Sequence, residues 1–526
     1  MSKNKKVLVK EDLSNCPYSD EEILEFRDGC LTNMEHRHTR YKELRSVLFD
    51  NEKKNDISKT IDDIVSLIYL PDNIIFDIVV DPEEEDKITE DVQRKLDRLN
   101  KVLSERFIYD RKNKYGLSIE FYDWFFWSCV YGTYIVKSIL DRDNVIFKAV
   151  SPFDFAVYYE DNRRLDKDQI FCHIARIPHH VAKRKYPDAE FLPTVSPPAR
   201  SDTFLDLVIS QNQSTQQFTV LPIYKVEEEL LTPKKVGEYV EVYEMWFWDY
   251  YTKDWFMAQI VGDKIYKSVN PFIPKEHPFT VFTPTPVEGF FWGLSELHYL
   301  TYLYLKIKEE TKRIDDVENL LSEPPLIVYG ISGNIEANEM QAKLKRPGSV
   351  VEIYDPTAKF DFYLPKLDPA IIFKAIEYYD NAFKEQSGIF GILGGHPMPN
   401  VRSASYANIL AQFASSVLKK KALRAEAFIE EVMTMFANCL VNSDTYFKEL
   451  LDISFRVDVF AHTSSPITAL AYQEMIMHLA DNQIIPPDVV IDMLPIPKKE
   501  KIKKFMQMKA LAEVQQGATQ KEQETK

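Results

Sequence analysis

Residues 388–442 read GIFGILGGHPMPNVRSASYANILAQFASSVLKKKALRAEAFIEEVMTMFANCLVN, and this stretch decides the fold. Its first part is rich in Gly and contains Pro397 and Pro399, whereas residues 404–442 contain neither Gly nor Pro. Because Gly and Pro are the strongest helix breakers, the pattern predicts a loop followed by one uninterrupted helix. At about 1.5 Å per residue, that helix would be roughly 58 Å long, which exceeds what a compact domain needs. Such helices are usually coiled coils, membrane spans or struts in large assemblies.

A basic cluster interrupts the apolar face of this long helix. Lys419, Lys420 and Lys421 are followed one turn later by Arg424. The cluster argues against a sustained coiled-coil seam and against a membrane span. It is either a solvated or intersubunit salt-bridge zone, or a small basic belt that contacts a polyanion. The role of a strut in an assembly is therefore favoured.

The composition is that of a folded, acidic protein. The chain has 526 residues, of which 45% are hydrophobic and 28% charged, and we expect two to four structural regions. The net charge of −16 argues against an extensive basic surface that grips nucleic acid, although not against a surface past which it slides. The 5 cysteines form no C-x-x-C pair, which predicts free thiols and no metal site. We expect a soluble protein without a cofactor or a membrane segment.

Hydrophobic periodicity predicts helices at both ends of the chain and strands in the middle. The predicted helices are 19–50, 58–69, 86–113, 117–130, 296–321, 368–387, 466–482 and 497–514. The predicted strands are 74–80, 134–140, 145–150, 153–159, 239–248, 255–261, 265–269, 326–329, 350–353 and 453–460. Residues 182–217 form a polar, Pro-containing insertion to which the pattern assigns no structure.

Motifs of catalysis or metal binding are absent or weak in the sequence. The glycines of 388–395 resemble a phosphate-binding loop, but a predicted helix precedes them and no Lys-Ser or Lys-Thr follows. His36 and His38 point to different faces of a helix, so a solvated surface is the better interpretation. His179 and His180 are predicted to lie in a loop.

The acidic run at residues 81–86 could hold a cation. It is better interpreted as a helix N-terminus that complements the helix dipole. No nucleophile elbow, Cys–His signature or paired-carboxylate motif stands out.

The order of the predicted parts resembles that of the portal (head-to-tail connector) proteins of tailed bacteriophages. Residues 131–136 (YGTYIV) and 149–154 (AVSPFD) are similar to the helix-to-hairpin segment of portal wings. Residues 293–297 (GLSEL) resemble the entry to the descending stem helix. Residues 383–389 (FKEQSGI) with 401–404 (VRSA) are similar to the end of the ascending helix, the tunnel loop and the start of the long wing helix. The resemblance covers roughly residues 65–510, and the 182–217 insertion has no counterpart.

The resemblance implies an α+β, portal-like subunit with a helical and β wing, a two-helix stem, a small α/β clip, a long wing helix and a helical crown. By position, the parts would be N-terminal helices and β-rich wing 1–292, first stem helix 293–322, clip 323–366, second stem helix 367–388, tunnel loop 389–403, long wing helix 404–442, crown 443–510 and disordered tail 511–526.

The resemblance also implies a function. Portal proteins form a ring, usually of twelve copies, at one capsid vertex, through which double-stranded DNA is packaged and later ejected. The implied partners are identical copies, DNA, the large terminase subunit, the major capsid and scaffolding proteins, and a head–tail adaptor. The chain would belong to the virion, and to the host cytoplasm during assembly. It would not be an enzyme, because the terminase is the ATPase.

Candidate site residues follow from the same positions. The residues expected at the DNA channel are Asn400, Arg402, Ser403, Lys419 and Lys420. The residues expected to dock partners on the clip are Glu336, Lys343, Lys345 and Arg346. The first rival hypothesis is a cytosolic enzyme with a Gly-rich active-site loop at 388–395. The second is a DNA-binding or scaffold module, which would need a strongly basic face.

Overall fold

The computed structural model describes residues 16–48, 56–71, 74–108, 116–141, 144–190, 239–269, 275–322, 324, 326–329, 350–353, 360–362, 369–388, 416–459, 475–480, 482 and 490. In these residues the strands form four sheets, and all paired strands except one pair are antiparallel. With the helices between them, this is an α+β arrangement. The chain divides into two units, one of Met1–Ser295 with Ser415–Lys526 and the other of Glu296–Ala414.

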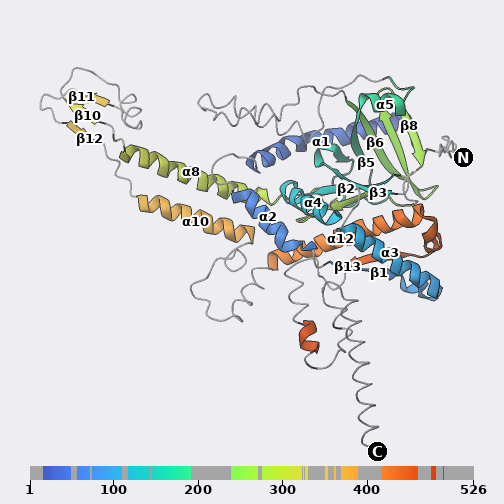
Figure 1. Ribbon diagram of the computed structural model, residues 1–526. Coiled ribbons are helices and arrows are strands. Elements are labelled where there is room, and N and C mark those ends of the chain that lie inside the picture. The colour runs from blue at the N-terminus through green and yellow to red at the C-terminus, as the bar shows by residue number, and fades with distance from the viewer. Residues whose placement is uncertain are drawn as a thin grey trace, which may run out of the picture. The chain divides into compact units, whose positions relative to one another are not determined.

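The larger unit is built around a five-stranded antiparallel sheet (Figure 1). In spatial order its strands are β4 (Phe155–Val157), β5 (Phe171–Pro178), β6 (Tyr239–Asp249), β7 (Asp254–Val261) and β8 (Lys264–Val269). Successive side chains of a strand point to opposite faces, so Met245 and Phe247 of β6 enter one core while Trp246 and Trp248 enter another. The continuous apolar run in β6 therefore reflects a sheet that is covered on both faces.

Helix α1 (Asp20–Leu48) covers the first face of this sheet. Its buried Cys30 and Met34 belong to the same core cluster as the sheet residues of that face. The predicted capping box at its start is confirmed. The Ser19 backbone N–H donates to the Glu22 carboxylate at 2.8 Å, and the Glu22 N–H donates to Ser19 Oγ at 3.3 Å.

A smaller sheet covers the second face. This sheet has the order β3 (Asn144–Val150), β2 (Tyr134–Asp141) and β9 (Phe279–Phe282), and α4 (Leu117–Tyr131) precedes it in the chain. Phe279 of β9 lies in the same core as Trp246, and their rings meet edge to face with centroids 5.8 Å apart. The predicted hairpin at 134–150 is confirmed, with Asp141 paired to Asn144.

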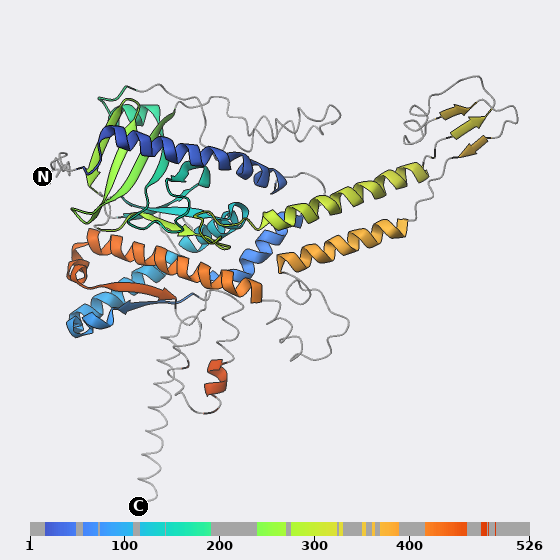
Figure 2. The ribbon, with the colours of Figure 1, turned by 180° about the vertical axis from the view of Figure 1, so that it is seen from behind.

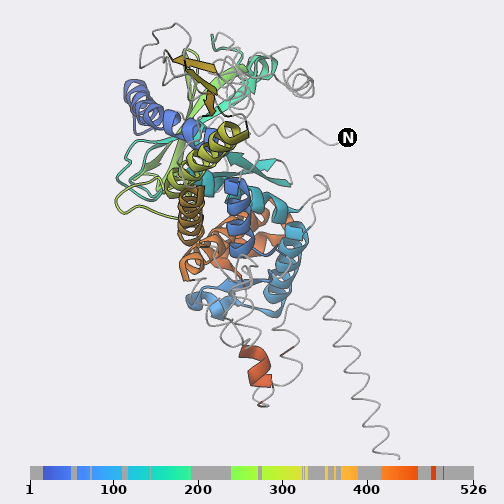
Figure 3. The ribbon, with the colours of Figure 1, turned by 90° about the vertical axis from the view of Figure 1, so that its left-hand side faces the viewer.

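Helix α12 (Ser416–Ser443) lies beside a two-stranded sheet and forms a third layer (Figures 2 and 3). The other elements of this layer are α2 (Asp56–Ile68), β1 (Phe76–Val80), α3 (Glu90–Ile108) and β13 (Phe455–Val459). β1 and β13 are antiparallel, with Phe76 opposite Val459. The ring of Phe428 on α12 lies 5.2 Å from Phe282 and 5.9 Å from Phe121, centroid to centroid. The apolar face of the long helix is thus buried among aromatic rings, as its sequence pattern requires.

The smaller unit is a helix pair with a three-stranded sheet. Helices α8 (Leu297–Ser322) and α10 (Pro369–Ser387) pack against each other. Between them in the chain come β10 (Leu326–Tyr329), β11 (Val350–Ile353) and β12 (Phe360–Phe362). β10 is central, parallel to β11 and antiparallel to β12. Both helices and two of these strands agree with the predicted ranges, while β12 was not predicted.

Three local predictions are wrong. The acidic run at 81–86 forms a 3-10 helix, Pro82–Lys87, and the α-helix starts later, at Glu90. The strand predicted at 153–159 shortens to Phe155–Val157, because Pro152 begins a 3-10 turn that the Ser151 hydroxyl caps.

The third concerns His179 and His180, which begin a short helix, α5 (His179–Lys185), rather than a loop. Ala182 of α5 is buried, and the basic residues of its last turn suit the negative end of the helix dipole.

Candidate functional site

The predicted DNA-contact residues fall partly within the described chain. Lys419 and Lys420 lie in the first turns of α12, and both side chains are exposed. Lys421, the next residue, is buried, and Arg424 donates from Nη1 to the carbonyl oxygen of Pro284 at 2.8 Å. Two residues of the four-residue basic cluster are therefore exposed to solvent, and the other two are held against the protein. The cluster is not a single solvated belt.

The other candidate residues lie outside the described residues. This applies to Asn400, Arg402 and Ser403 at the expected channel, and to Glu336, Lys343, Lys345 and Arg346 on the expected clip. It also applies to residues 404–415, the first part of the predicted long helix, and to most of 466–514. The Gly-rich segment 389–395, on which the enzyme hypothesis depends, is outside them as well.

Two of the stretches that resemble portal sequences meet in space. Gly132, which ends α4, has a φ of 84° in the left-handed region, where glycine is favoured. A Cβ on Gly132 would come within 2.2 Å of the carbonyl oxygen of Gly293. The N–H of Gly293 donates to Thr133 Oγ1 at 2.8 Å, and the Ser295 hydroxyl donates to the carbonyl oxygen of Val130. These small residues are thus required by a close approach of two backbone segments.

The helix pair α8–α10 exposes large apolar side chains. Tyr299, Tyr302 and Leu305 of α8 follow one another at three-residue spacing, so they share one side of the helix. Ile371 and Tyr378 of α10, seven residues apart, also share a side. The exposed fractions are 61% for Tyr302, 66% for Ile371 and 69% for Tyr378. An apolar stripe of this kind marks an interaction surface.

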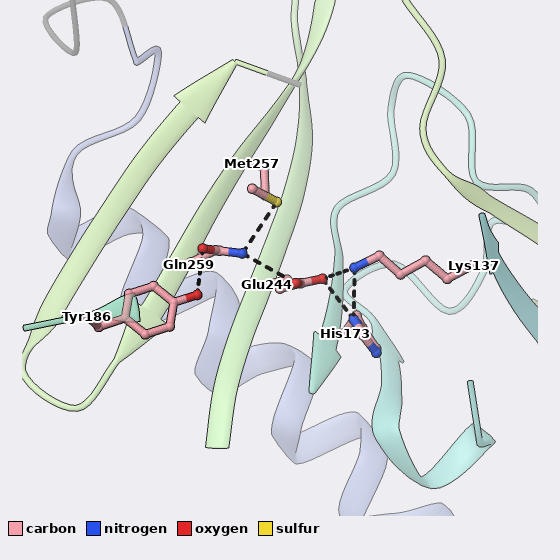
Figure 4. Close-up of polar contacts among 6 residues, drawn as sticks. All are labelled: Lys137, His173, Tyr186, Glu244, Met257 and Gln259. Carbon is pink, nitrogen blue, oxygen red and sulfur yellow. Dashed lines mark hydrogen bonds and ion pairs between the residues drawn. The ribbon is translucent and has the colours of Figure 1, made fainter. Parts of the chain in front are cut away.

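A buried polar cluster crosses the two sheets of the larger unit (Figure 4). His173 of β5, Glu244 of β6 and Gln259 of β7 stand opposite one another in a single cross-strand row. Lys137 of β2 reaches the same carboxylate of Glu244 from the facing sheet. His173 Nδ1 lies 2.8 Å from Glu244 Oε2, and Gln259 Nε2 donates to Glu244 Oε1 at 3.3 Å. The Tyr186 hydroxyl donates to Gln259 Oε1 at 2.8 Å and completes the cluster.

The charges in this cluster depend on each other. Burial opposes ionisation of Glu244, but Lys137 and His173 outweigh it and hold the pKa of Glu244 well below its usual range. Burial, reinforced by the neighbouring Lys137, lowers the pKa of His173 from 6.5 to about 4. His173 is therefore neutral at pH 7 and donates its Nδ1 proton to the carboxylate. All three side chains are buried, so the cluster fixes one sheet against the other rather than contacting a ligand.

Two adjoining pockets lie where α12 passes the loop between β4 and β5. The larger, of about 990 Å³, is lined by six carboxylates and three basic side chains, with Arg456 paired to Asp458. The smaller, of about 500 Å³, is lined by Arg163, Arg164 and Arg424. Glu431 borders both and keeps one side open to solvent. Crowding by the surrounding atoms, with help from Glu276, raises the pKa of Glu431 to about 7, while Arg164 opposes this.

Sequence reasoning missed both the buried cluster and the arginine pocket. The available signal for the first was a titratable residue inside each of three largely apolar strands, at Lys137, His173 and Glu244. The adjacent Arg163 and Arg164 were the signal for the second. In the part of the chain that is described, no group of three or more His, Cys, Asp or Glu side chains could hold a metal ion.

No protein-family model matches the chain, and no curated protein matches it. Of the helices described here, none is both long and apolar enough to cross a membrane.

Proposed function

We propose that the chain is the portal subunit of a tailed bacteriophage. In this role, identical copies form a ring at one capsid vertex, and double-stranded DNA passes through its central channel during packaging and ejection. The ring is also the docking platform for the terminase and the tail proteins. The observation that carries the proposal is the exposed apolar stripe on the helix pair α8–α10, taken with the order of parts along the sequence.

The stripe needs a partner. Burying a large apolar side chain contributes about 1.5–3 kcal/mol, so leaving Tyr302, Ile371 and Tyr378 in water is unfavourable for an isolated subunit. A second copy of the same helix pair is a suitable cover, because head-to-tail contact between different faces of identical subunits gives a ring when the rotation between neighbours closes. Several charged residues of α8 form pairs along the helix, such as Arg313 with Glu309.

Lys419 and Lys420 add a second, weaker support. They are exposed on α12 in an otherwise acidic chain, which suits brief contacts with a phosphate backbone rather than tight binding. Tight contacts would slow DNA that has to move through a channel.

The test measures assembly of the purified chain by light scattering and negative-stain electron microscopy. A twelve-subunit ring would have a mass of roughly 0.7 MDa, from subunits of 61.4 kDa, and a visible central hole. The double variant Tyr299→Glu/Tyr302→Glu places two charges in the stripe and should abolish rings while the helical circular dichroism stays unchanged.

The matched control is Tyr251→Glu, since Tyr251 is 94% exposed but lies on the β6–β7 turn of the other unit. It should assemble as the unmodified chain does. Rings that tolerate both glutamates would overturn the role of the stripe in assembly. A chain that stays monomeric or dimeric at every concentration would overturn the proposal and favour the enzyme hypothesis. That hypothesis also predicts a small ligand bound near 388–395.

A further inference from the structure

Three arginines from distant parts of the chain converge on one pocket. Arg163 and Arg164 lie in the loop between β4 and β5, and Arg424 lies on α12, roughly 260 residues later. All three line the pocket of about 500 Å³ in the larger unit. The fold therefore brings three positive charges together in one pocket, although the guanidinium groups repel one another.

Arg164 lies close enough to Glu431 to lower the pKa of that carboxyl, but the arginines of this pocket make no close ion pair with any carboxylate among the described residues. Arg424 is held in place by its hydrogen bond to Pro284 O at 2.8 Å, which leaves its remaining donors for another group. Partial burial and the nearby Arg163 lower the pKa of Arg424, as expected where like charges are brought together.

The rest of the lining strengthens attraction for an anion. Phe279, Phe282 and Phe428 line the pocket as well, and all three are buried, so they keep the effective dielectric constant low there. Two carboxylates also line it. Asp166 accepts a hydrogen bond from Asn162 Nδ2 at 2.7 Å, and desolvation raises the pKa of Glu431, which favours its neutral form.

We propose that this pocket binds a phosphate group, carried either by a nucleic-acid backbone or by a free phosphate or nucleotide. Guanidinium groups match phosphate oxygens with paired, charge-assisted hydrogen bonds, and three of them around one cavity can surround such a group. The inference goes beyond the proposed function, because the pocket is formed within one subunit and binding does not require a ring.

The test uses inorganic phosphate and pyrophosphate as probes and the full chain as the protein. Binding is measured by isothermal titration calorimetry at constant ionic strength, with chloride as the balancing anion. The double variant Arg163→Gln/Arg164→Gln should weaken pyrophosphate binding at least about tenfold, because each substitution removes charged hydrogen bonds. Both side chains are exposed, so the fold should be kept. Arg424→Lys keeps the charge but not the planar fork and should weaken binding less.

The control is Arg94→Gln, an exposed arginine on α3 that is paired with Glu90 and lies outside the pocket. It should bind pyrophosphate as the unmodified chain does. Equal affinity in the double variant and the control, or no binding to the unmodified chain, would overturn the proposal.

A fluorescent duplex of DNA distinguishes the two sources of phosphate. If the duplex binds and pyrophosphate displaces it from the unmodified chain but not from the double variant, the backbone is the source. If pyrophosphate binds but the duplex does not compete, a free phosphate or nucleotide is the source.

Discussion

Acid should weaken the larger unit through His173. The pKa of this imidazole is 6.5 in an unfolded chain and about 4 in the fold, so the unfolded state takes up a proton first as the pH falls. The contribution of His173 to the free energy of unfolding is fully present above pH 6.5, and it is lost as the pH falls towards 4. With about 1.4 kcal/mol for each tenfold difference in proton affinity, the loss between pH 7 and pH 4 is about 3 kcal/mol. Glu244, whose pKa is also held low, loses its contribution in the same direction below its unfolded pKa of 4.5.

The variant His173→Gln removes the titration but keeps a polar side chain. We expect it to be less stable than the unmodified chain at pH 7, and its free energy of unfolding should fall about 3 kcal/mol less between pH 7 and pH 4. The assay is urea unfolding followed by fluorescence of the tryptophans in the sheet, such as Trp246 and Trp255. His180→Gln is the control, because it makes the same substitution at an exposed position on α5, outside the buried cluster. Equal pH slopes for His173→Gln and the unmodified chain would refute the reasoning.

Two further outcomes are expected. Gly293→Ala should cost about 3 kcal/mol of unfolding free energy, because its Cβ would lie 2.3 Å from the Gly132 carbonyl oxygen. Gly289→Ala is the control and should cost only about 1 kcal/mol, because Gly289 has open space around it and only its φ of 68° is unfavourable for alanine. The prediction is checked by chemical denaturation, and it is contradicted if Gly289→Ala lowers the unfolding free energy as much as Gly293→Ala does. Lys419→Gln with Lys420→Gln should change stability by less than about 0.5 kcal/mol but alter DNA retention, and an unchanged yield of filled heads would reject that role.

Most elements could be predicted because their patterns are local. The apolar spacing of α3 and the Pro-bounded end of α8 need no knowledge of the fold. β5 and α5 were not predicted, and α5 overlaps the start of the 182–217 insertion, to which the pattern assigns no structure. The loop was predicted at His179 because no capping residue precedes it: the N-cap position of α5 is Pro178, whose side chain makes no capping hydrogen bond.

The polar sites could not be predicted because they depend on pairing between distant segments. Glu244 lies 107 residues from Lys137, and its role is set by the register of β5, β6 and β7. The pocket arginines meet only because α12 packs against β9, which the sequence pattern does not specify. The predicted basic belt failed for the same reason. Arg424 bonds to the carbonyl oxygen of Pro284, which is distant in sequence, and so it does not join the exposed Lys419 and Lys420.

The pairing of Phe76 with Val459 has a consequence for synthesis. Strand β1 leaves the ribosome roughly 380 residues before the strand that completes its sheet, and at about 5–20 residues per second this delay lasts from roughly 20 seconds to more than a minute. During that interval the nascent chain presents an unpaired β edge, which favours association with other chains. A chaperone that shields early translation products should therefore raise the yield of soluble protein more than one that acts after release.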